Sequence, residues 1–288
     1  MILYRYILIF MIFLSTAYSN PIELELQSQN IHNANVVLIT AKSKSANNLK
    51  ALLNTKEIDF VKHPFKKGFY YVLVPFHYYM EFKSHQLIIT YTLNNKEYFE
   101  GFDINLKEDN YESEKIRVNN SKVTLSPKNK NRVSKEYQEA MSVYKGVTSQ
   151  SYWYRDFIYP MQSKITSAFG TKRVYNSTVK SYHTGIDFKA DINSSVQASN
   201  NGVVKIVKNR FYAGNSIIID HGHGIYTCYF HLNKIFVSQG DFVQREDIIG
   251  LSGNTGRTTG PHLHFATFVN GIQINPVKLF ETLNTLNN

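Results

Sequence analysis

The sequence predicts a mainly β protein with a small N-terminal β-sandwich, a linker that carries one helix, and a C-terminal antiparallel β-sheet domain. Three observations indicate this organisation. The chain has 288 residues, which exceeds the common size of a single domain. Short alternating or β-branched segments, separated by turn residues, recur through both halves. Hydrophobic residues make up 43% of the chain, which is enough for packed cores and argues against disorder.

Residues 1–19 are typical of an export signal. Arg5 precedes a short apolar run at 7–14, and residues 17–19 supply small side chains for cleavage. An uncleaved membrane anchor is the alternative, because Ile2 and Leu3 lengthen the apolar stretch. The run is nevertheless shorter than the roughly 20 residues that cross a bilayer. In either case we expect an exported, periplasmic protein that meets a membrane only through this segment.

Residues 20–106 are predicted to form the N-terminal β domain. Five segments alternate with period two or are rich in β-branched and aromatic residues, as strands are: 22–26, 36–40, 69–74, 87–92 and 98–104. The sequence Leu-Asn-Asn-Lys at 93–96 is a turn between the last two. Four histidines lie here without the spacing of metal ligands, and we expect no metal role for His32, His63, His77 or His85.

Residues 107–157 are predicted to be a linker with one helix. Ser126-Pro127 is interpreted as a break in the chain, Ser134 as the N-cap, and Gly146 as the end of the helix. Apolar side chains at helical spacing are expected to pack as one face; they are Val133, Tyr137, Met141 and Tyr144. A second β-rich region, 158–280, follows and is expected to form the C-terminal domain, with 281–288 as a tail.

Charge and cysteine content restrict the class of function. The formal net charge is +10, which favours attraction to anionic surfaces such as cell-wall polymer or lipid headgroups. The lysines are scattered without a basic stripe, so together with the export signal we expect no nucleic-acid partner. The one cysteine, Cys228, excludes an intramolecular disulfide and is expected to be a buried strand residue.

Four histidines and one aspartate in three short segments are the candidate functional residues: His183, Asp187, His231, His262 and His264. Three such side chains suit a catalytic zinc ion, which takes three protein ligands and keeps one position open. The other two histidines can handle protons beside it. One Zn²⁺ per chain is therefore expected.

The spacing of these residues sets conditions on the backbone. His183 and Asp187 would lie about 13 Å apart on a straight strand, so the chain must bend between them, and Gly185 is where a bend costs least. His262 and His264 fall on the same side of a strand, about 7 Å apart. His231 lies near a strand end. Two further histidines, His221 and His223, are expected in a hairpin turn, with surface or turn roles.

Six ordered motifs in the C-terminal half resemble the lysostaphin/LytM-type zinc metallopeptidases. They are FGTKR (169–173), HTGIDF (183–188), NGVV (201–204), YFHL (229–232), GLSGNTG (250–256) and GPHLHF (260–265). The resemblance covers about residues 158–280. The N-terminal part is similar only loosely to the β domains that precede such peptidases in exported murein hydrolases.

The resemblance implies specific roles. His183, Asp187 and His264 match the zinc ligands of the family, and His231 and His262 match its two catalytic histidines that do not bind metal. The implied fold is an antiparallel sheet with a groove across the metal. The sequence departs from the family at Glu246-Asp247, where Gly-Gln is usual, and at Ala266, where glutamate is common. Neither position is a ligand, so altered groove detail and retained chemistry are expected.

The implied function is hydrolysis of peptide cross-links in peptidoglycan by a zinc endopeptidase of D,D type, in wall remodelling and cell-shape determination. Two alternatives remain open. One is a carboxypeptidase that trims stem peptides, and the other is an inactive LytM-like protein that activates an amidase. A further hypothesis is that the N-terminal domain folds over the groove and inhibits the enzyme.

Overall fold

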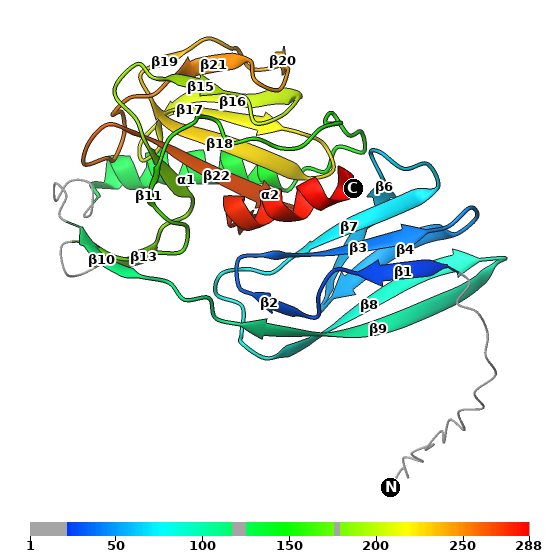
Figure 1. The fold of residues 1–288 in the computed structure, drawn as a ribbon. Coiled ribbons are helices and arrows are strands. Elements are labelled where there is room, and N and C mark those ends of the chain that lie inside the picture. The colour runs from blue at the N-terminus through cyan, green and yellow to red at the C-terminus, as the bar shows by residue number, and fades with distance from the viewer. Residues whose placement is uncertain (1–21, 117–124, 176–178, 288) are drawn as a thin grey trace, which may run out of the picture.

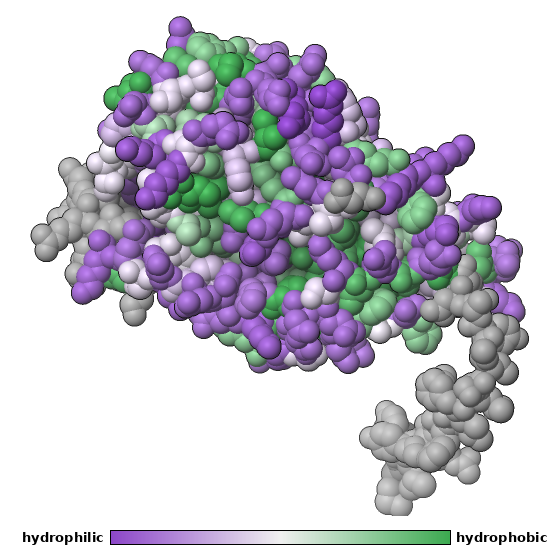
Figure 2. All heavy atoms as spheres, in the orientation of Figure 1, coloured by the Kyte–Doolittle hydropathy of each residue, from purple (hydrophilic) through white to green (hydrophobic). Residues whose placement is uncertain are grey.

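The computed structural model describes residues 22–116, 125–175 and 179–287, arranged as two β domains with a helix between them (Figure 1). The predicted export signal lies outside the described residues. None of the described helices is long and apolar enough to cross a membrane. On the face drawn in Figure 2 hydrophilic residues predominate, and hydrophobic residues appear in small groups between them.

The N-terminal domain is a β-sandwich, as predicted. Its first sheet has the order β1-β3-β7-β6, with β1 at Glu23–Leu26, β3 at Val36–Lys42, β7 at Phe69–Pro75 and β6 at Val61–Lys62. Its second sheet has the order β2-β9-β8-β4-β5, with β2 at Asn30–His32, β9 at Lys96–Lys107, β8 at Ser84–Leu93, β4 at Asn47–Leu53 and β5 at Lys56–Asp59. One core lies between the sheets, in which Val37 and Ile39 of β3 cluster with Leu87 and Ile89 of β8.

The predicted turn between β8 and β9 is confirmed. Asn94 and Asn95 have φ values of 50° and 59°, the left-handed conformation that a two-residue type I′ hairpin turn requires. Asparagine tolerates this region better than most residues, so the sequence specified the turn. β4 and β5 were not predicted, because their lysines, asparagines and glutamate obscure the alternation that marks a half-buried strand.

The linker differs from the prediction in two ways. β10 (Ser113–Ile116) pairs in parallel with β12 (Lys172–Tyr175), which in turn pairs with β13 (Val179–Tyr182). Helix α1 spans Pro127–Tyr144 and its N-cap is Ser126, not Ser134, because the Ser126 side chain accepts a hydrogen bond from the Asn129 backbone. Proline is favoured at the first helical position, where its missing N–H costs nothing, so Ser126-Pro127 starts the helix instead of breaking the chain.

The large sheet of the C-terminal domain is antiparallel, as predicted. Its order is β11-β14-β22-β18-β17-β16-β20, with β23 paired to β22. The strands are β11 (Ile165–Ser167), β14 (Ile186–Lys189), β22 (His262–Val269), β18 (Ile225–Leu232), β17 (Gly214–Asp220), β16 (Gly202–Arg210), β20 (Phe242–Val243) and β23 (Ile272–Ile274). A three-stranded sheet lies beside it, in the order β15 (Ser195–Gln197), β21 (Ile248–Leu251) and β19 (Lys234–Ile235).

A helix covers each face of the large sheet. α1 packs on one face, where Ala140 and Tyr144 cluster with Cys228 and Ala266. Cys228 is fully buried in β18, as predicted. Tyr137 was expected in the packed face of α1 but is 63% exposed, because the buried side runs through Glu136, Ala140 and Tyr144 instead.

The other face is covered by α2 (Pro276–Asn284), which lies between the sheet and the N-terminal domain (Figure 1). Residues 281–288 were predicted to be a tail, and this was wrong. α2 continues to Asn284, a short 3-10 helix follows at Thr285–Asn287, and Leu283 and Leu286 are buried. These leucines join a core that includes Phe265 of β22 and Val36 and Leu38 of β3. The two domains therefore share one hydrophobic core.

A buried hydrogen bond also joins the domains. The Tyr71 hydroxyl of β7 lies 2.8 Å from Nδ1 of His223, and Nε2 of His223 lies 3.1 Å from the Ser149 carbonyl oxygen. Since a carbonyl only accepts, the proton of His223 is on Nε2 and the Tyr71 hydroxyl donates to Nδ1. Both side chains are buried, so neither can replace this partner with bulk water.

Replacing Tyr71 with phenylalanine should lower the free energy of unfolding by about 1–3 kcal/mol, because it leaves a buried acceptor on His223 without a donor. Chemical denaturation of the purified protein measures this. Tyr70→Phe is the matched control, since Tyr70 is only partly buried on the other side of the same strand. Equal stability of the two variants would contradict the role of this hydrogen bond.

Candidate metal centre

Pairing between β14 and β22 brings two of the predicted ligands together. In this antiparallel register Asp187 is directly opposite His264. Their neighbours Ile186 and Phe265 point into the core on the other face and are 1% and 0% exposed. Side chains directly opposite on one face have Cβ atoms roughly 5 Å apart, so the register alone places the carboxylate beside the imidazole.

His183 joins them through the predicted bend at Gly185. His183 follows β13, the chain turns through Thr184 and Gly185, and Asp187 lies on β14. Nε2 of His183 then lies 2.9 Å from Oδ1 of Asp187 and 3.0 Å from Nδ1 of His264. The third side of this triangle, from Nδ1 of His264 to Oδ1 of Asp187, is 2.8 Å. Among the described residues, this is the group of histidine, cysteine, aspartate and glutamate side chains that can hold a metal ion.

The protonation of His183 favours a cation at this point. Its Nδ1 lies 2.8 Å from the Ala168 carbonyl oxygen and 3.1 Å from the Ser167 hydroxyl. Because the carbonyl can only accept, Nδ1 carries the proton and Nε2 presents a lone pair toward Asp187 and His264. Lone pairs about 3 Å apart repel one another unless a cation lies between them. Ligands of a tetrahedral zinc ion, at 2.0–2.1 Å each, are about 3.3 Å apart, so the donor set fits zinc after a small expansion.

Asp187 is held ionised. Its burial by itself raises the pKa, but the contacts with His183 and His264 outweigh burial, so the pKa of Asp187 lies well below its usual range. Nη2 of Arg173 lies 3.3 Å from Oδ2, the outer carboxylate oxygen, which leaves Oδ1 facing the two imidazoles. Arg173 also binds Glu114 of β10 and the Ser167 hydroxyl. β10, which belongs to the predicted linker, thus supports the metal centre.

His262 faces the open side of the group. It begins β22, two residues before His264, and its Nε2 lies 3.7 Å from Oδ1 of Asp187. Its Nδ1 lies 2.8 Å from the Gly260 carbonyl oxygen, so this nitrogen is the donor and Nε2 is unprotonated in the neutral ring. The prediction that His262 and His264 share one side of a strand is confirmed.

His231 reaches the same side only because β18 is irregular. The register with β17 shifts between Asn215 and Ile217, where Leu232 and Tyr229 are the partners. His231 has φ of +63°, a conformation that non-glycine residues rarely adopt. Phe230 and His231 consequently both face the metal side, and the His231 ring centroid lies 4.8 Å from that of His262.

The electrostatic state of His231 is set by its surroundings. Burial and the nearby rings of His264 and His262 lower the pKa of His231 to about 3. Nδ1 lies 2.7 Å from the Thr255 carbonyl oxygen and is therefore the protonated nitrogen of the neutral ring. Like His183 and His262, His231 is fixed by a backbone carbonyl so that Nε2 is the nitrogen available for chemistry.

The structure thus brings together all five residues that the sequence singled out. Its other histidines lie elsewhere, and two that were expected in a turn are buried: His221 is 0% exposed and His223 is 7% exposed. Arg173 and Glu114 were missed as site residues. Arg173 is part of the FGTKR motif, but Glu114 lies in the linker and no signal in the sequence marks it.

Comparison with known proteins finds similarity in the C-terminal half. Residues 181–276 match the model of Peptidase family M23. Over 42% of the chain, the protein is 46% identical to the peptidoglycan DD-endopeptidase ShyA of Vibrio cholerae, and over 41% it is 38% identical to the DD-carboxypeptidase/endopeptidase Mpg of Neisseria meningitidis. The matches span only 29% and 27% of those relatives.

The fold of both domains has a counterpart among solved structures. A crystal structure from Pseudomonas aeruginosa, of a protein described as an M23 peptidase, superposes with a TM-score of 0.64 at 21% identity. The superposition covers 84% of this chain and 92% of that one. At this identity the similarity concerns the fold, including the N-terminal sandwich.

Gly185→Ala should abolish tight metal binding. A Cβ at this position would lie 2.3 Å from the Phe265 carbonyl oxygen and 2.7 Å from Nε2 of His264, so the ring of a predicted ligand must move. Calorimetric titration with Zn²⁺ measures the affinity. Gly260→Ala is the control, because a Cβ there meets nothing within 4 Å although Gly260 is two residues from His262. Unchanged zinc affinity in Gly185→Ala would contradict the assigned geometry.

His221 should make the fold sensitive to acid. Burial lowers its pKa from 6.5 to about 4. The folded state therefore binds fewer protons than the unfolded state between these values, so stability is greatest above pH 6.5 and falls as the pH drops toward 4. The loss attributable to this group is about 3 kcal/mol.

The measurement is the free energy of unfolding between pH 7 and 4 in the presence of a chelator, for the natural protein and His221→Gln. We expect the free energy of unfolding to depend less steeply on pH in the variant. The difference in slope should correspond to at most one bound proton. The other histidines contribute equally to both proteins, so identical slopes would show that His221 does not titrate as described.

Proposed function

Since residues 181–276 match the model of Peptidase family M23, we propose that the protein is a zinc-dependent peptidoglycan hydrolase that cuts peptide cross-links. The observation that carries the proposal is the convergence of His183, Asp187 and His264, with two further imidazoles on the open side. The relatives from Vibrio cholerae and Neisseria meningitidis are named for this substrate, which supports the assignment.

The three converging side chains are the proposed ligands of one Zn²⁺ ion. When bound, zinc supplies a Lewis acid that polarises the scissile carbonyl and lowers the pKa of water toward about 7. Asp187 provides the single negative charge among the ligands, which leaves the centre net positive and receptive to a developing oxyanion. Arg173 holds the carboxylate in place through its outer oxygen.

The two remaining histidines are proposed to move protons. His262 is partly exposed and directs Nε2 toward the open side, so it is placed to take a proton from the attacking water. His231, whose Nδ1 is fixed on the Thr255 carbonyl, is placed to receive at Nε2 the second proton of the attacking water and to deliver it to the leaving amine. Its low pKa suits a group that must be neutral before the reaction and must release the proton readily.

Endopeptidase activity of D,D type is the favoured activity, and carboxypeptidase activity is the second candidate because the Neisseria relative is named for both. A role only as an amidase activator is disfavoured, since all five functional positions are occupied and lie together. We further propose that the protein acts in the periplasm after export through residues 1–19, and that cross-link cleavage serves wall remodelling and cell shape.

Inhibition by the N-terminal domain is disfavoured by its position. The core of this domain packs with α2 on the face of the large sheet opposite the metal group, and only the loop with His77 and Tyr78 extends toward the metal side. To cover the group it would have to leave that core and expose apolar surface, which costs about 25 cal/mol per Å². Deleting the domain is therefore a poor test, because it would expose the apolar side chains of the shared core.

The activity is tested on isolated peptidoglycan, with released muropeptides resolved by chromatography and mass spectrometry and zinc measured in parallel. We expect cross-linked dimers to fall to monomers with about one zinc per chain. His264→Ala should lose both zinc and turnover. His262→Ala should keep zinc and lose at least about a hundredfold in rate, since it removes a proton carrier and no ligand.

His223→Gln serves as the control for general damage, because His223 lies at the domain junction and away from the metal group. Shortening of stem peptides alone would establish the carboxypeptidase instead. Zinc binding without any cleavage would overturn the enzymatic proposal.

A further inference from the structure

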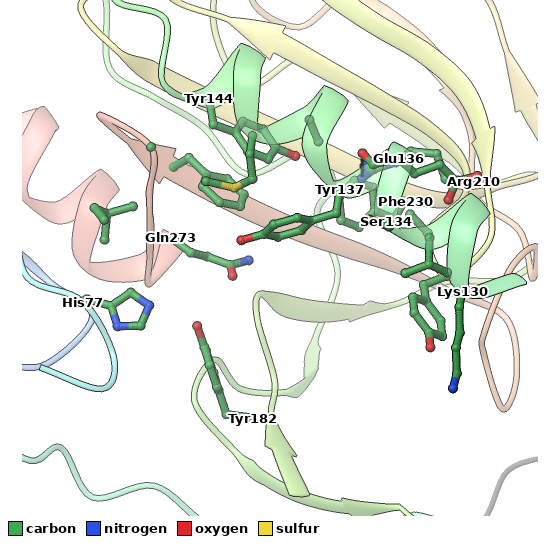
Figure 3. A pocket seen from close by; sticks show the side chains of 18 of the residues that line it. His77, Lys130, Ser134, Glu136, Tyr137, Tyr144, Tyr182, Arg210, Phe230 and Gln273 are labelled. Carbon is green, nitrogen blue, oxygen red and sulfur yellow. Dashed lines mark hydrogen bonds between the residues drawn. The ribbon is translucent and has the colours of Figure 1, made fainter. Parts of the chain in front are cut away.

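A cleft beside the metal group is formed mostly by residues outside the usual ligand motifs. It has a volume of about 900 Å³ and lies between α1, the end of β13, and strands β18, β22 and β23. One residue of the N-terminal domain, His77, completes its rim (Figure 3). This volume is in the upper part of the range of about 300–1,000 Å³ that is typical of ligand sites. We call it the α1 cleft.

The α1 cleft adjoins the metal group directly. Phe230 lies in its wall and stacks on His264, with ring centroids 5.4 Å apart and an interplanar angle of 6°. Tyr182, also in the wall, immediately precedes His183. Gln273 lines the cleft and donates a hydrogen bond from Nε2 to the carbonyl oxygen of Thr184, in the bend between two predicted ligands. A substrate that lies across the metal group can therefore extend into the cleft.

The lining combines an apolar wall with converging polar groups. Tyr144 and Phe268 stack on each other, 3.7 Å apart, and form the apolar side. Figure 3 shows the tips of Tyr137, Tyr182 and Gln273 directed into the space, opposite His77. Among the described residues, the hydroxyls of Tyr137 and Tyr182 have no hydrogen-bond partner and are available to a ligand. A few polar groups that converge in an apolar hollow are typical of a binding site.

The charges around the cleft favour a ligand with a carboxylate. Glu136 is the one acid in the lining, and its carboxylate is already bound by Nε of Arg132 at 2.7 Å and the Phe211 backbone at 2.8 Å. Lys130 is exposed at the rim. Arg210 lines the cleft as well, and its Nη2 donates to the Glu136 carbonyl oxygen at 3.2 Å. The charge still available to a ligand is therefore positive.

The N-terminal domain fixes one wall of the cleft. The ring of Tyr78 stacks on Tyr182 at a centroid distance of 3.8 Å and an interplanar angle of 1°, and the Tyr78 hydroxyl donates to the Gly170 carbonyl oxygen at 3.0 Å. Ala266, where the family commonly has glutamate, is fully buried beneath α1 with Ala140. A glutamate at that position would bury a charge under the helix, so the small side chain lets α1 pack on the metal face.

We propose that the α1 cleft binds a stem peptide of the substrate on one side of the bond that is cut. This rests on the proposed peptidoglycan hydrolase function. A stem peptide supplies amide groups for the tyrosine hydroxyls and Gln273, apolar side chains for the wall of Tyr144 and Phe268, and a carboxylate for Lys130. A neutral glycan would match the aromatic wall but leave the positive charges without a partner.

Binding is tested by calorimetry on zinc-loaded full-length protein, with two probes: the sugar-free stem tetrapeptide and a neutral disaccharide of N-acetylglucosamine. We expect the tetrapeptide to bind and Tyr137→Ala to weaken it about tenfold. Lys130→Gln should weaken it about threefold and reduce its dependence on salt. Tyr137 is 63% exposed, so the variant should fold normally.

Two control variants substitute a tyrosine and a lysine that lie outside the cleft. Tyr154 is 58% exposed outside the lining, and Lys128 lies on α1 but does not line the cleft. Tyr154→Ala and Lys128→Gln should bind the tetrapeptide as the natural protein does. Binding of the disaccharide in place of the tetrapeptide, or equal binding by Tyr137→Ala and Tyr154→Ala, would overturn the proposal.

Steady-state kinetics on soluble cross-linked muropeptides separate this proposal from the function on which it rests. Tyr137→Ala should raise KM with little change in kcat, because it removes binding and leaves the reacting groups intact. If the natural protein cuts the substrate and Tyr137→Ala has the same KM, only the cleft assignment fails. If the natural protein with bound zinc cuts nothing, the proposed function fails first.

Discussion

The register between β14 and β22 is the constraint on which the rest of the site depends. Because side chains alternate across a strand, Asp187 and His264 face the metal side only while Ile186, Phe188, Leu263 and Phe265 face the core. A slip of one residue would bury the carboxylate and expose four large apolar side chains. The hydrophobic pattern that stabilises the sheet therefore also fixes the position of two predicted ligands, and no separate device is needed to hold them.

Backbone carbonyls determine the chemistry of the imidazoles. Ala168, Thr255 and Gly260 each accept a hydrogen bond from Nδ1 of a histidine, so that Nε2 is unprotonated in His183, His231 and His262. The carbonyls belong to loops whose conformation is held by the surrounding strands. The candidate metal centre is thus preorganised by main-chain groups, which side-chain substitutions alone do not remove, and Arg173 completes it by holding the outer oxygen of Asp187.

The N-terminal domain is part of the structure of the C-terminal half. The two share a core through α2, and Tyr71 and Tyr78 contact the C-terminal domain by a hydrogen bond to His223 and a stacked ring on Tyr182. The same contacts that stabilise the junction orient a side chain next to a predicted ligand. The domain and α1 together shape the space beside the metal group, whereas the ligands come from the matched region 181–276 alone.

The sequence by itself determined the β class, the sandwich, the hairpin at Asn94-Asn95, the bend at Gly185 and the five residues of the centre, because each depends on local pattern or on a specific motif. It did not determine the start of α1, because Ser126-Pro127 is typical both of a break in the chain and of the start of a helix. It also did not determine the helix at the C-terminus, part of which was predicted to be a tail. Only the tertiary structure decided that His231 turns to the metal side. Strict alternation would place His231 with Tyr229 in the core, and the irregular pairing of β18 with β17 reverses it. Glu114, Tyr78 and Tyr137 are likewise assigned by contacts between segments far apart in the chain, which no local pattern encodes.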